Sequence, residues 1–195
     1  MNRDISKNIV DFLFEAGILQ NTPRSGNTFL GSGNQTIGSH IFRTVLIGFV
    51  LSKLAGANTE EVMKMCLFHD IEETRTGDIN YLQQRYVVSD DVRALRDIVS
   101  NLPFKDEIVR TITDYEMLDS LEAKIAKDAD TLELIFYLKE QLDKGNSQAQ
   151  NWLDHAKKRL LTDIAKELIP AIQNCNYYDW WYNLTDEWHK GNKKW

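Results

Sequence analysis

A long, nearly uninterrupted apolar stretch from residue 39 to residue 56, SHIFRTVLIGFVLSKLAG, constrains the fold more than any other feature of this chain. Its boundaries suit a helix, with Gly38 or Ser39 at the start and Gly56 at the end. A helix that is apolar on nearly all sides must be buried on most of its surface. The sequence therefore predicts a central core helix around which the rest of the chain packs.

Helical periodicity continues along most of the chain. Apolar residues recur every three or four positions in segments that we predict as helices, over about 4–17, 59–77, 90–101, 104–115, 120–143, 149–174 and 179–190. No segment shows the alternation that is typical of a strand. Residues 20–38 are rich in Gly, Asn, Ser and Thr, which indicates a loop, and long loops are usually functional or disordered. We therefore predict an all-α fold, a compact helical bundle with a long Gly-rich loop between its first two helices.

Length and composition indicate one soluble globular unit. The chain has 195 residues, enough for a single well-buried helical core, with 43% hydrophobic and 27% charged residues. No stretch approaches the roughly 20 apolar residues of a membrane span, and the N-terminus lacks a signal core. We therefore expect no membrane span and a cytoplasmic location. The net charge of −6 argues against sequence-independent binding to DNA or RNA, but it leaves a single nucleotide in a local pocket open.

Two of the four histidines, His40 and His69, lie on the two helices that are predicted to be most buried. His69 is followed directly by Asp70, and Glu73 follows one turn later. Burying this much charge in an apolar environment is costly unless a cation compensates for it. A pair of neutral core histidines, each bonded to a backbone carbonyl, is the structural alternative. The sequence favours the cation because the histidines and the carboxylates occur together.

These residues can face one cavity. On a helix, His69 and Glu73 are four residues apart and Asp70 and Glu73 are three apart, so all three can project toward one side. A further acid must come from elsewhere, and Asp130 lies on the apolar side of a long predicted helix. Asp128 is offset by two positions and should face outward. For Asp130, a salt bridge to a neighbouring lysine or to another helix is equally compatible with the sequence.

A His, then a His–Asp pair, then a distant Asp on mostly helical segments resembles the HD-domain metal-dependent phosphohydrolases. HDIEETRTGD at 69–78 is similar to the HDxxExxTGD stretch of the bacterial 5'-deoxynucleotidases and their eukaryotic HD-domain relatives, and KDADTLE at 127–133 resembles their second acidic motif. The likeness covers roughly residues 5–143. It implies a single HD domain over residues 1–195, with its core at about 5–143 and a C-terminal helical extension at about 147–190.

The predicted loop carries a further part of the family pattern. Pro23, Arg24 and Gly26 resemble the family's PRTGW segment, although Asn27 stands where a Trp is usual. The acid that usually precedes the first His of the pattern is also missing, because Ser39 stands there. If the family Trp helps to fit the sugar, its replacement predicts a looser preference for deoxyribose.

The resemblance implies one divalent transition metal ion, Mn, Co, Fe, Ni or Zn, with four protein ligands: His40, His69, Asp70 and Asp130. Two imidazoles and two carboxylates form a mixed N/O set that suits these ions and leaves positions for water and a phosphate oxygen. The resemblance also implies catalytic roles for Glu73 and Asp78, with Glu73 orienting or deprotonating a water. For Asp78, stabilisation of the turn after Gly77 is the structural alternative.

The implied reaction is the removal of the 5'-phosphate from a (deoxy)nucleoside monophosphate, and a cyclic or polyphosphorylated nucleotide is the alternative substrate. Arg24 suits a phosphate clamp because a guanidinium makes bidentate bonds to phosphate oxygens, and a solvated loop cation is the alternative. Retention of Glu73 and Asp78 favours an enzyme over a metal-keeping regulatory module. We expect the aromatic residues near the C-terminus to pack on the helical core or on the second subunit of a homodimer.

Overall fold

The computed structural model describes residues 3–185 and 187–191. Regular structure in these residues is helical, and β-type pairing among them is limited to one isolated antiparallel bridge between Pro23 and Thr36. The prediction of an all-α fold is therefore confirmed.

The α-helices are α1 (Arg3–Ala16), α2 (Gly26–Leu30), α3 (Ile37–Ala55), α4 (Thr59–Phe68), α5 (Glu73–Thr76), α6 (Asp91–Val99), α7 (Lys105–Met117), α8 (Leu121–Asp143), α9 (Gln148–Ala156), α10 (Asp163–Glu167), α11 (Ile169–Asn174) and α12 (Asp179–Tyr182). Short 3-10 helices are η1 (Gly17–Gln20), η2 (Gln83–Arg85), η3 (Lys157–Arg159) and η4 (Trp188–Lys190).

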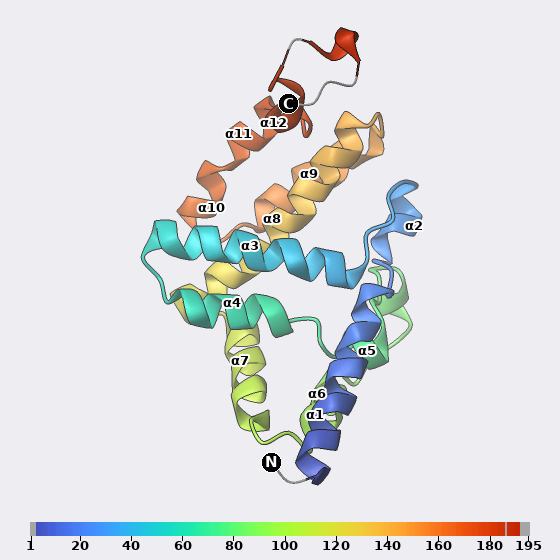
Figure 1. The fold of residues 1–195 in the computed structure, drawn as a ribbon, viewed down its shortest axis with the longest axis vertical. Helices are drawn as coiled ribbons and strands as arrows, with labels where there is room; N and C mark the ends of the chain where they lie inside the picture. Colours follow the sequence, from blue (N-terminus) through green and yellow to red (C-terminus); the bar gives the residue numbers. More distant parts are fainter. Residues whose placement is uncertain (1–2, 186, 192–195) are drawn as a thin grey trace.

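Helix α8 forms the centre of the core. It packs against α3, α4, α7 and α9, and Figure 1 shows α3 crossing in front of it. Its Ala126, Ala129 and Leu132 side chains are completely buried because helices cover it on several sides. Close packing continues between α3 and α4, where a Cβ added to Gly48 would lie 2.7 Å from the Sγ atom of Cys66. Tight contacts among α3, α4 and α8 fix the relative positions of the polar residues that they carry.

Helix α3 is less buried than its composition predicts. Its C-terminal end agrees with the prediction, because Gly56 ends the helix in a left-handed conformation. Its N-terminal end lies earlier than the predicted Gly38 or Ser39, because Thr36 is the N-cap and Ser39 completes the capping box from inside the first turn. One face packs on α4 and α8, but the other leaves Phe42, Leu46 and Phe49 exposed. The expectation that most of this helix is buried is therefore wrong, since apolar composition does not distinguish a core helix from one with a free apolar face.

By length and composition alone, α3 could cross a membrane. This corrects the expectation that no stretch approaches a membrane span. The buried core helix of a soluble protein meets the same two criteria, so they are weak evidence for a span. The absence of a membrane span stays a prediction.

The helix predicted over 59–77 ends early. Helix α4 stops at Phe68, and the hydrogen bonds from Ile71 N to Phe68 O and from Glu73 N to Asp70 O form tight turns before the short helix α5. Adjacent residues of a continuous helix point about 100° apart. By leaving the helix at His69, the chain lets His69 and Asp70 approach the same point.

The helix predicted over 149–174 is divided into α9, η3, α10 and α11. The break between η3 and α10 is stabilised by Asp128 of α8. Its side chain is completely buried and accepts hydrogen bonds from Leu161 N at 2.7 Å and from Thr162 N at 2.7 Å. The expectation that Asp128 faces outward is therefore wrong. Its carboxylate satisfies the backbone of the turn between η3 and α10, where Thr162 also caps α10.

Two further segments differ from the prediction. The loop over 20–38 contains the short helix α2, which packs against Trp152 at Gly26. The helix predicted over 179–190 is present only as α12 and η4. Residue 186 in this segment lies outside the described residues.

Candidate functional site

Three helices bring polar side chains to one point inside the bundle. His40 lies in the first turn of α3, His69 caps the end of α4, and Asp130 lies in the middle of α8. His40 Nε2 is 3.2 Å from His69 Nε2 and 3.4 Å from Asp130 Oδ1. One ligand atom from each of the three lies within 4.8 Å of the others. This spacing allows one ion to contact all three.

Asp70 reaches the same point from the turn after α4. Its Oδ2 atom is 3.2 Å from His69 Nε2 and 3.7 Å from His40 Nε2. The structure therefore brings together the four residues predicted as metal ligands, and their assignment as ligands stays a prediction. Asp130 also lies 3.6 Å from Lys127 Nζ, so the ion pair proposed as an alternative is present beside the cluster.

The hydrogen bonds of the two imidazoles fit a bound metal. His40 Nδ1 lies 2.6 Å from a carboxylate oxygen of Glu133, and His69 Nδ1 lies 3.0 Å from the backbone oxygen of Cys66. Both oxygens act as acceptors, so each Nδ1 carries the proton when the imidazole is neutral. Two Nε2 lone pairs then face each other at 3.2 Å and cannot bond to one another. A cation between them removes this repulsion, and metal-bound histidines commonly have such outer partners.

The electrostatics of the cluster favour positive charge at its centre. Burial opposes protonation of His69, but the adjacent Asp70 carboxylate outweighs it and raises the pKa of His69 to about 9. Burial also opposes ionisation of Asp70, yet the charge of His69 lowers the pKa of Asp70 to about 2. For Asp130, the hydrogen bond from His40 overcomes burial and holds the pKa well below its usual range. Two carboxylates thus remain ionised beside the imidazoles, a donor set that suits a divalent cation.

Glu133 positions His40, a role that the sequence analysis did not assign. Its side chain is almost completely buried and bonds to His40 through one oxygen, while the other accepts from Arg43 Nε at 2.8 Å and Gln35 Nε2 at 2.7 Å. Arg43 also pairs with Glu140. The signal was present, because Glu133 ends the KDADTLE motif one helical turn after Asp130.

Arg24 lies inside the site. Its Nη1 atom is 3.3 Å from Asp70 Oδ2, and its Nε atom is 3.7 Å from Asp78 Oδ2. Asp78 also accepts a hydrogen bond from Ser25 N at 2.8 Å. The alternative of a solvated loop cation is therefore wrong for Arg24. Asp78 therefore holds the backbone of the loop at Ser25 and the guanidinium of Arg24 in place. This role extends beyond the stabilisation of the turn after Gly77.

Glu73 is held in the pocket without a bonding partner for one of its oxygens. Its Oε2 atom is buried and makes no hydrogen bond within the described part of the chain. Burial, together with the charges of Asp70 and Asp78, raises the pKa of Glu73 to about 9. Arg75, two residues further along the chain, bonds to Glu15 with Nε at 2.6 Å. The free oxygen of Glu73 is thus available to a water or a ligand.

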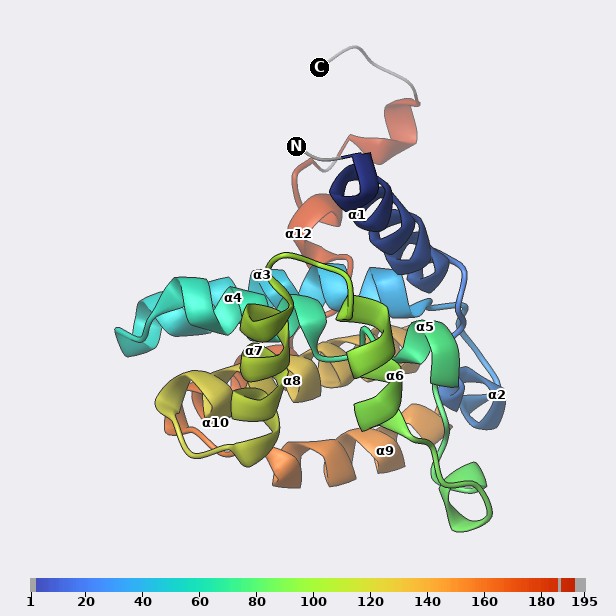
Figure 2. The same cartoon turned by 90° about the horizontal axis from the view of Figure 1, so that it is seen from below.

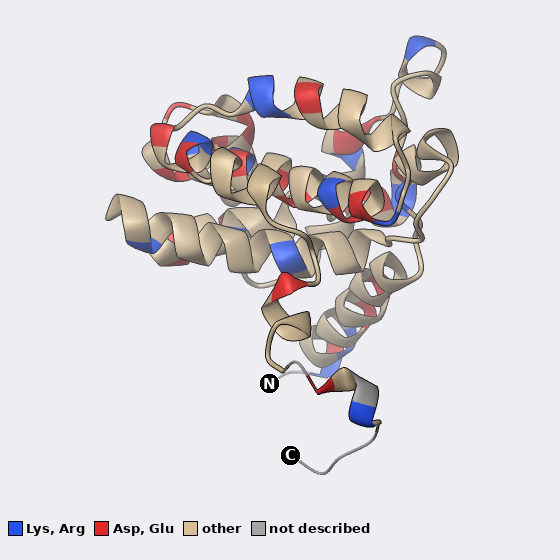
Figure 3. Cartoon of the chain, turned by 90° about the horizontal axis from the view of Figure 1, so that it is seen from above, with Lys and Arg blue, Asp and Glu red and all other residues tan. Residues whose placement is uncertain are grey.

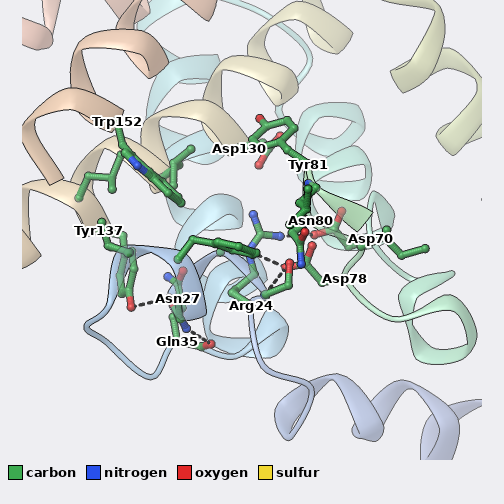
Figure 4. Close-up of a pocket in the computed structure, with 18 of the residues that line it drawn as sticks. Arg24, Asn27, Gln35, Asp70, Asp78, Asn80, Tyr81, Asp130, Tyr137 and Trp152 are labelled. Atoms are coloured by element: carbon green, nitrogen blue, oxygen red, sulfur yellow. Dashed lines mark hydrogen bonds and ion pairs between the residues drawn. The ribbon is translucent and has the colours of Figure 1, made fainter. Parts of the chain in front are cut away.

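A cavity of about 460 Å³ opens beside this cluster. Figure 4 shows the charged residues Arg24, Asp70 and Asp78 on one side of it, with Tyr137 and Trp152 on the other. The volume lies within the range of about 300–1,000 Å³ that is typical of sites for small ligands. The cavity therefore has room for a molecule with a charged end and an apolar end.

Charges elsewhere on the chain are mixed. Figure 3 shows Lys and Arg interspersed with Asp and Glu along the helices. His155 is exposed and lies outside the cluster, and the side chain of His189 lies outside the described residues. The expectation that the protein binds no polymeric nucleic acid stays a prediction.

Comparisons with known proteins agree with the geometry. The model of the HD domain family matches residues 16–173. The 5'-deoxynucleotidase HDDC2 of Bos taurus is 25% identical over 176 residues, which cover 86% of this chain and 85% of the relative. The 5'-deoxynucleotidase hdd1 of Schizosaccharomyces pombe is 28% identical over 158 residues, covering 76% of this chain and 79% of the relative.

A solved structure shares the fold. The HD phosphohydrolase DatZ of cyanophage S-2L, bound to dA and one catalytic Zn²⁺ ion, superposes with a TM-score of 0.50 and 19% sequence identity. The match covers 82% of this chain and 93% of that one. With the family model matching most of its length, this chain belongs to the HD domain family of metal-dependent phosphohydrolases.

Proposed function

We propose that this protein removes the 5'-phosphate from nucleoside monophosphates, using one divalent metal ion held by four side chains: His40, His69, Asp70 and Asp130. One observation carries the proposal. Two imidazole Nε2 atoms and two ionised carboxylates converge at the charged end of a cavity that also contains Arg24. When bound, a divalent ion at this point supplies Lewis-acid polarisation of a phosphate oxygen and lowers the pKa of a coordinated water.

The remaining residues of the charged end have complementary roles. Arg24 donates hydrogen bonds to the phosphate oxygens, and Asp78 fixes the orientation of its guanidinium. The charge of a bound divalent ion would lower the pKa of Glu73, so that Glu73 accepts a proton from the attacking water through its free oxygen. Water then forms a new bond to phosphorus, the bond from phosphorus to the 5'-oxygen breaks, and Glu73 returns the proton to that oxygen. The products are a nucleoside and inorganic phosphate.

The relatives support a nucleotide as the substrate. Two of them are named as 5'-deoxynucleotidases, and the cyanophage phosphohydrolase binds dA beside one Zn²⁺ ion. The metal of this chain is one of Mn, Co, Fe, Ni or Zn, since the mixed donor set suits all of these ions.

A phosphate-release screen tests the proposed function. The purified protein is incubated with each of these five metals and with nucleoside 5'-monophosphates, 3'-monophosphates, cyclic nucleotides and nucleoside triphosphates. We expect release from the 5'-monophosphates above all other classes. Release from cyclic or polyphosphorylated nucleotides alone would assign the site to a different phosphohydrolase, and no release with any metal would contradict the proposed function.

Sugar selectivity is expected to be loose. Asn27 stands where the family has Trp, and its side chain is occupied, since Oδ1 accepts from Tyr137 OH at 2.8 Å and Nδ2 donates to Gln35 O at 3.0 Å. It is therefore not free to contact a sugar. Within the same screen, ribonucleotides should be hydrolysed beside deoxyribonucleotides, and inert ribonucleotides would contradict this expectation.

Replacing Arg24 should weaken substrate binding more than turnover. We expect Arg24→Ala to raise KM by roughly 10- to 100-fold, because hydrogen bonds between charged groups contribute about 1.5–3 kcal/mol. Arg24→Lys keeps the charge but loses the bidentate geometry, so its KM should lie between those of the parent and Arg24→Ala. Steady-state kinetics with metal content measured on the same samples provide the check. An unchanged KM at full metal content would remove Arg24 from the phosphate site.

We also propose that the protein forms a homodimer through the exposed face of α3. Phe42, Leu46, Phe49, Val50 and Leu54 are all exposed and share one side of this helix. Figure 2 shows α1 and α12 projecting on the same side of α3.

Light scattering coupled to size-exclusion chromatography tests this assembly. The parent should elute at about twice 22.6 kDa, and Leu46→Glu should elute as a monomer because a charge in an apolar interface is costly. Val88→Glu is the matched control, since Val88 is 97% exposed on a loop away from α3. A monomeric parent at micromolar concentration would contradict the dimer.

A further inference from the structure

The apolar end of the cavity contains a large aromatic side chain from outside the motif segments. Trp152 lies on α9, which is anchored against the core by three buried residues of the same helix, Ala149, Leu153 and Ala156. Trp152 itself is partly buried and lines the cavity. Its position three residues after Ala149 and four before Ala156 keeps it on the inner side of α9. The packing of α9 therefore holds the indole ring in the cavity wall.

The loop below this ring is fixed as well. A Cβ added to Gly26 would lie 3.5 Å from Trp152 Cζ3, so the ring rests on the backbone at Gly26. The next residue, Asn27, is tied to α8 by its bond with Tyr137. Asn146 binds the end of α2 by donating to Leu30 O at 2.8 Å. Neither the ring nor its support needs to be ordered when a ligand enters, which lowers the entropic cost of binding.

The surroundings of Trp152 suit a flat apolar group. Leu134 and Leu138 of α8 line the cavity near it, and Figure 4 places Trp152 across the cavity from Asp70 and Asp78. A phosphate bound at the charged end would leave this apolar end empty. A nucleobase attached to the phosphate through its sugar has an aromatic face that stacks on indole.

We propose that Trp152 is the stacking platform for the nucleobase of the substrate, and this inference rests on the proposed function. Helix α9 thus contributes an aromatic ring beside the loop in which Asn27 stands where the family segment has Trp. Trp152 selects substrates that carry a base over phosphate esters of the sugar alone. Its role is binding specificity, and it takes no part in proton transfer.

Paired substrates test the proposal. Trp152→Leu and Trp152→Phe are compared with the parent on a nucleoside 5'-monophosphate and on 2-deoxyribose 5-phosphate, which has no base. Stacking of one base on an aromatic side chain corresponds to roughly tenfold or more in affinity. We expect Trp152→Leu to lower kcat/KM for the nucleotide by about tenfold and to leave 2-deoxyribose 5-phosphate unchanged, while Trp152→Phe retains most of the parental value. Tyr86→Leu is the control, because Tyr86 is an aromatic residue that is 80% exposed and does not line the cavity.

The outcomes separate stacking from packing. If Trp152 only supports the loop that carries Arg24, the variant loses activity on both substrates alike, and the proposal is overturned. Equal nucleotide activity in parent and variant overturns it too. Calorimetric titration with 2'-deoxyadenosine provides a readout without turnover, and weaker binding to Trp152→Leu is expected. If no phosphate ester is hydrolysed but this difference in nucleoside binding remains, the proposed function fails while the base site stands.

Discussion

Glu73→Gln is expected to lower kcat by roughly 10²–10⁴ while metal content and Tm stay near the parental values. Gln has nearly the same shape as Glu but cannot accept a proton. Glu73 lies in the cavity with a buried Oε2 atom that makes no hydrogen bond within the described residues, so the substitution breaks no contact of that atom. Loss of turnover without loss of stability is the result expected for a general base.

Glu72 offers a matched control for this experiment. It also has a buried Oε2 atom without a partner in the described part of the chain, but it does not line the cavity. Glu72→Gln should therefore keep the parental kcat. Steady-state kinetics, elemental analysis and thermal melting on the same preparations decide the point. Near-parental kcat in Glu73→Gln at full metal occupancy would remove Glu73 from the mechanism.

His69→Ala and Asp130→Ala are each expected to lower the metal content from about one ion per chain to near zero. Each variant removes one of the atoms that converge between α3, α4 and α8. A ligand that binds only the folded state stabilises it by about 2.7–4.1 kcal/mol at 100- to 1,000-fold its Kd, so both variants should also melt at lower temperature than the loaded parent. Elemental analysis and calorimetry measure the two effects.

Asp128→Asn separates metal loss from general destabilisation. Asp128 lies on the same helix as Asp130, but it bonds to the turn at Leu161 and Thr162. The free energy of unfolding of this variant should fall by about 1–3 kcal/mol, because the buried hydrogen bonds to the turn are weakened. Its metal content should stay at the parental value, because no ligand is removed. Full metal content in either His69→Ala or Asp130→Ala would show that the residue is not a ligand.

Local sequence predicted inward positions for the members of the cluster, and the resemblance to the HD-domain phosphohydrolases implied that they bind one ion together. His40 and His69 lie on apolar helices where an unpaired polar group is costly, and Asp130 lies on the inner side of its helix. A patterned helix fixes the direction of its side chains, so the three residues could be expected inside the core before the packing was known. Because α4 ends at Phe68, Asp70 extends into the site from a turn instead of from a helix. Asp70 still lies beside His69, as predicted.

Features that depend on contacts between distant segments could not be predicted. Asp128 is buried because the turn at Leu161 needs an acceptor, and this turn lies 33 residues away in sequence. Likewise, the position of Trp152 over Gly26 depends on how α9 packs on α8. The free face of α3 also escaped prediction, because its apolar residues resemble those of a core helix. Periodicity predicts which face of a helix is apolar, but it does not predict whether another helix, a second subunit or solvent contacts that face.

Metal dependence of phosphate release tests the central claim most directly. The protein is stripped with a chelator, and the rate of phosphate release from a nucleoside 5'-monophosphate is measured as the ion is added back. We predict release at background level in the stripped protein and a rate that saturates at about one ion per chain. Release at the parental rate from protein with less than about a tenth of an ion per chain would contradict a metal-dependent phosphohydrolase built on His40, His69, Asp70 and Asp130.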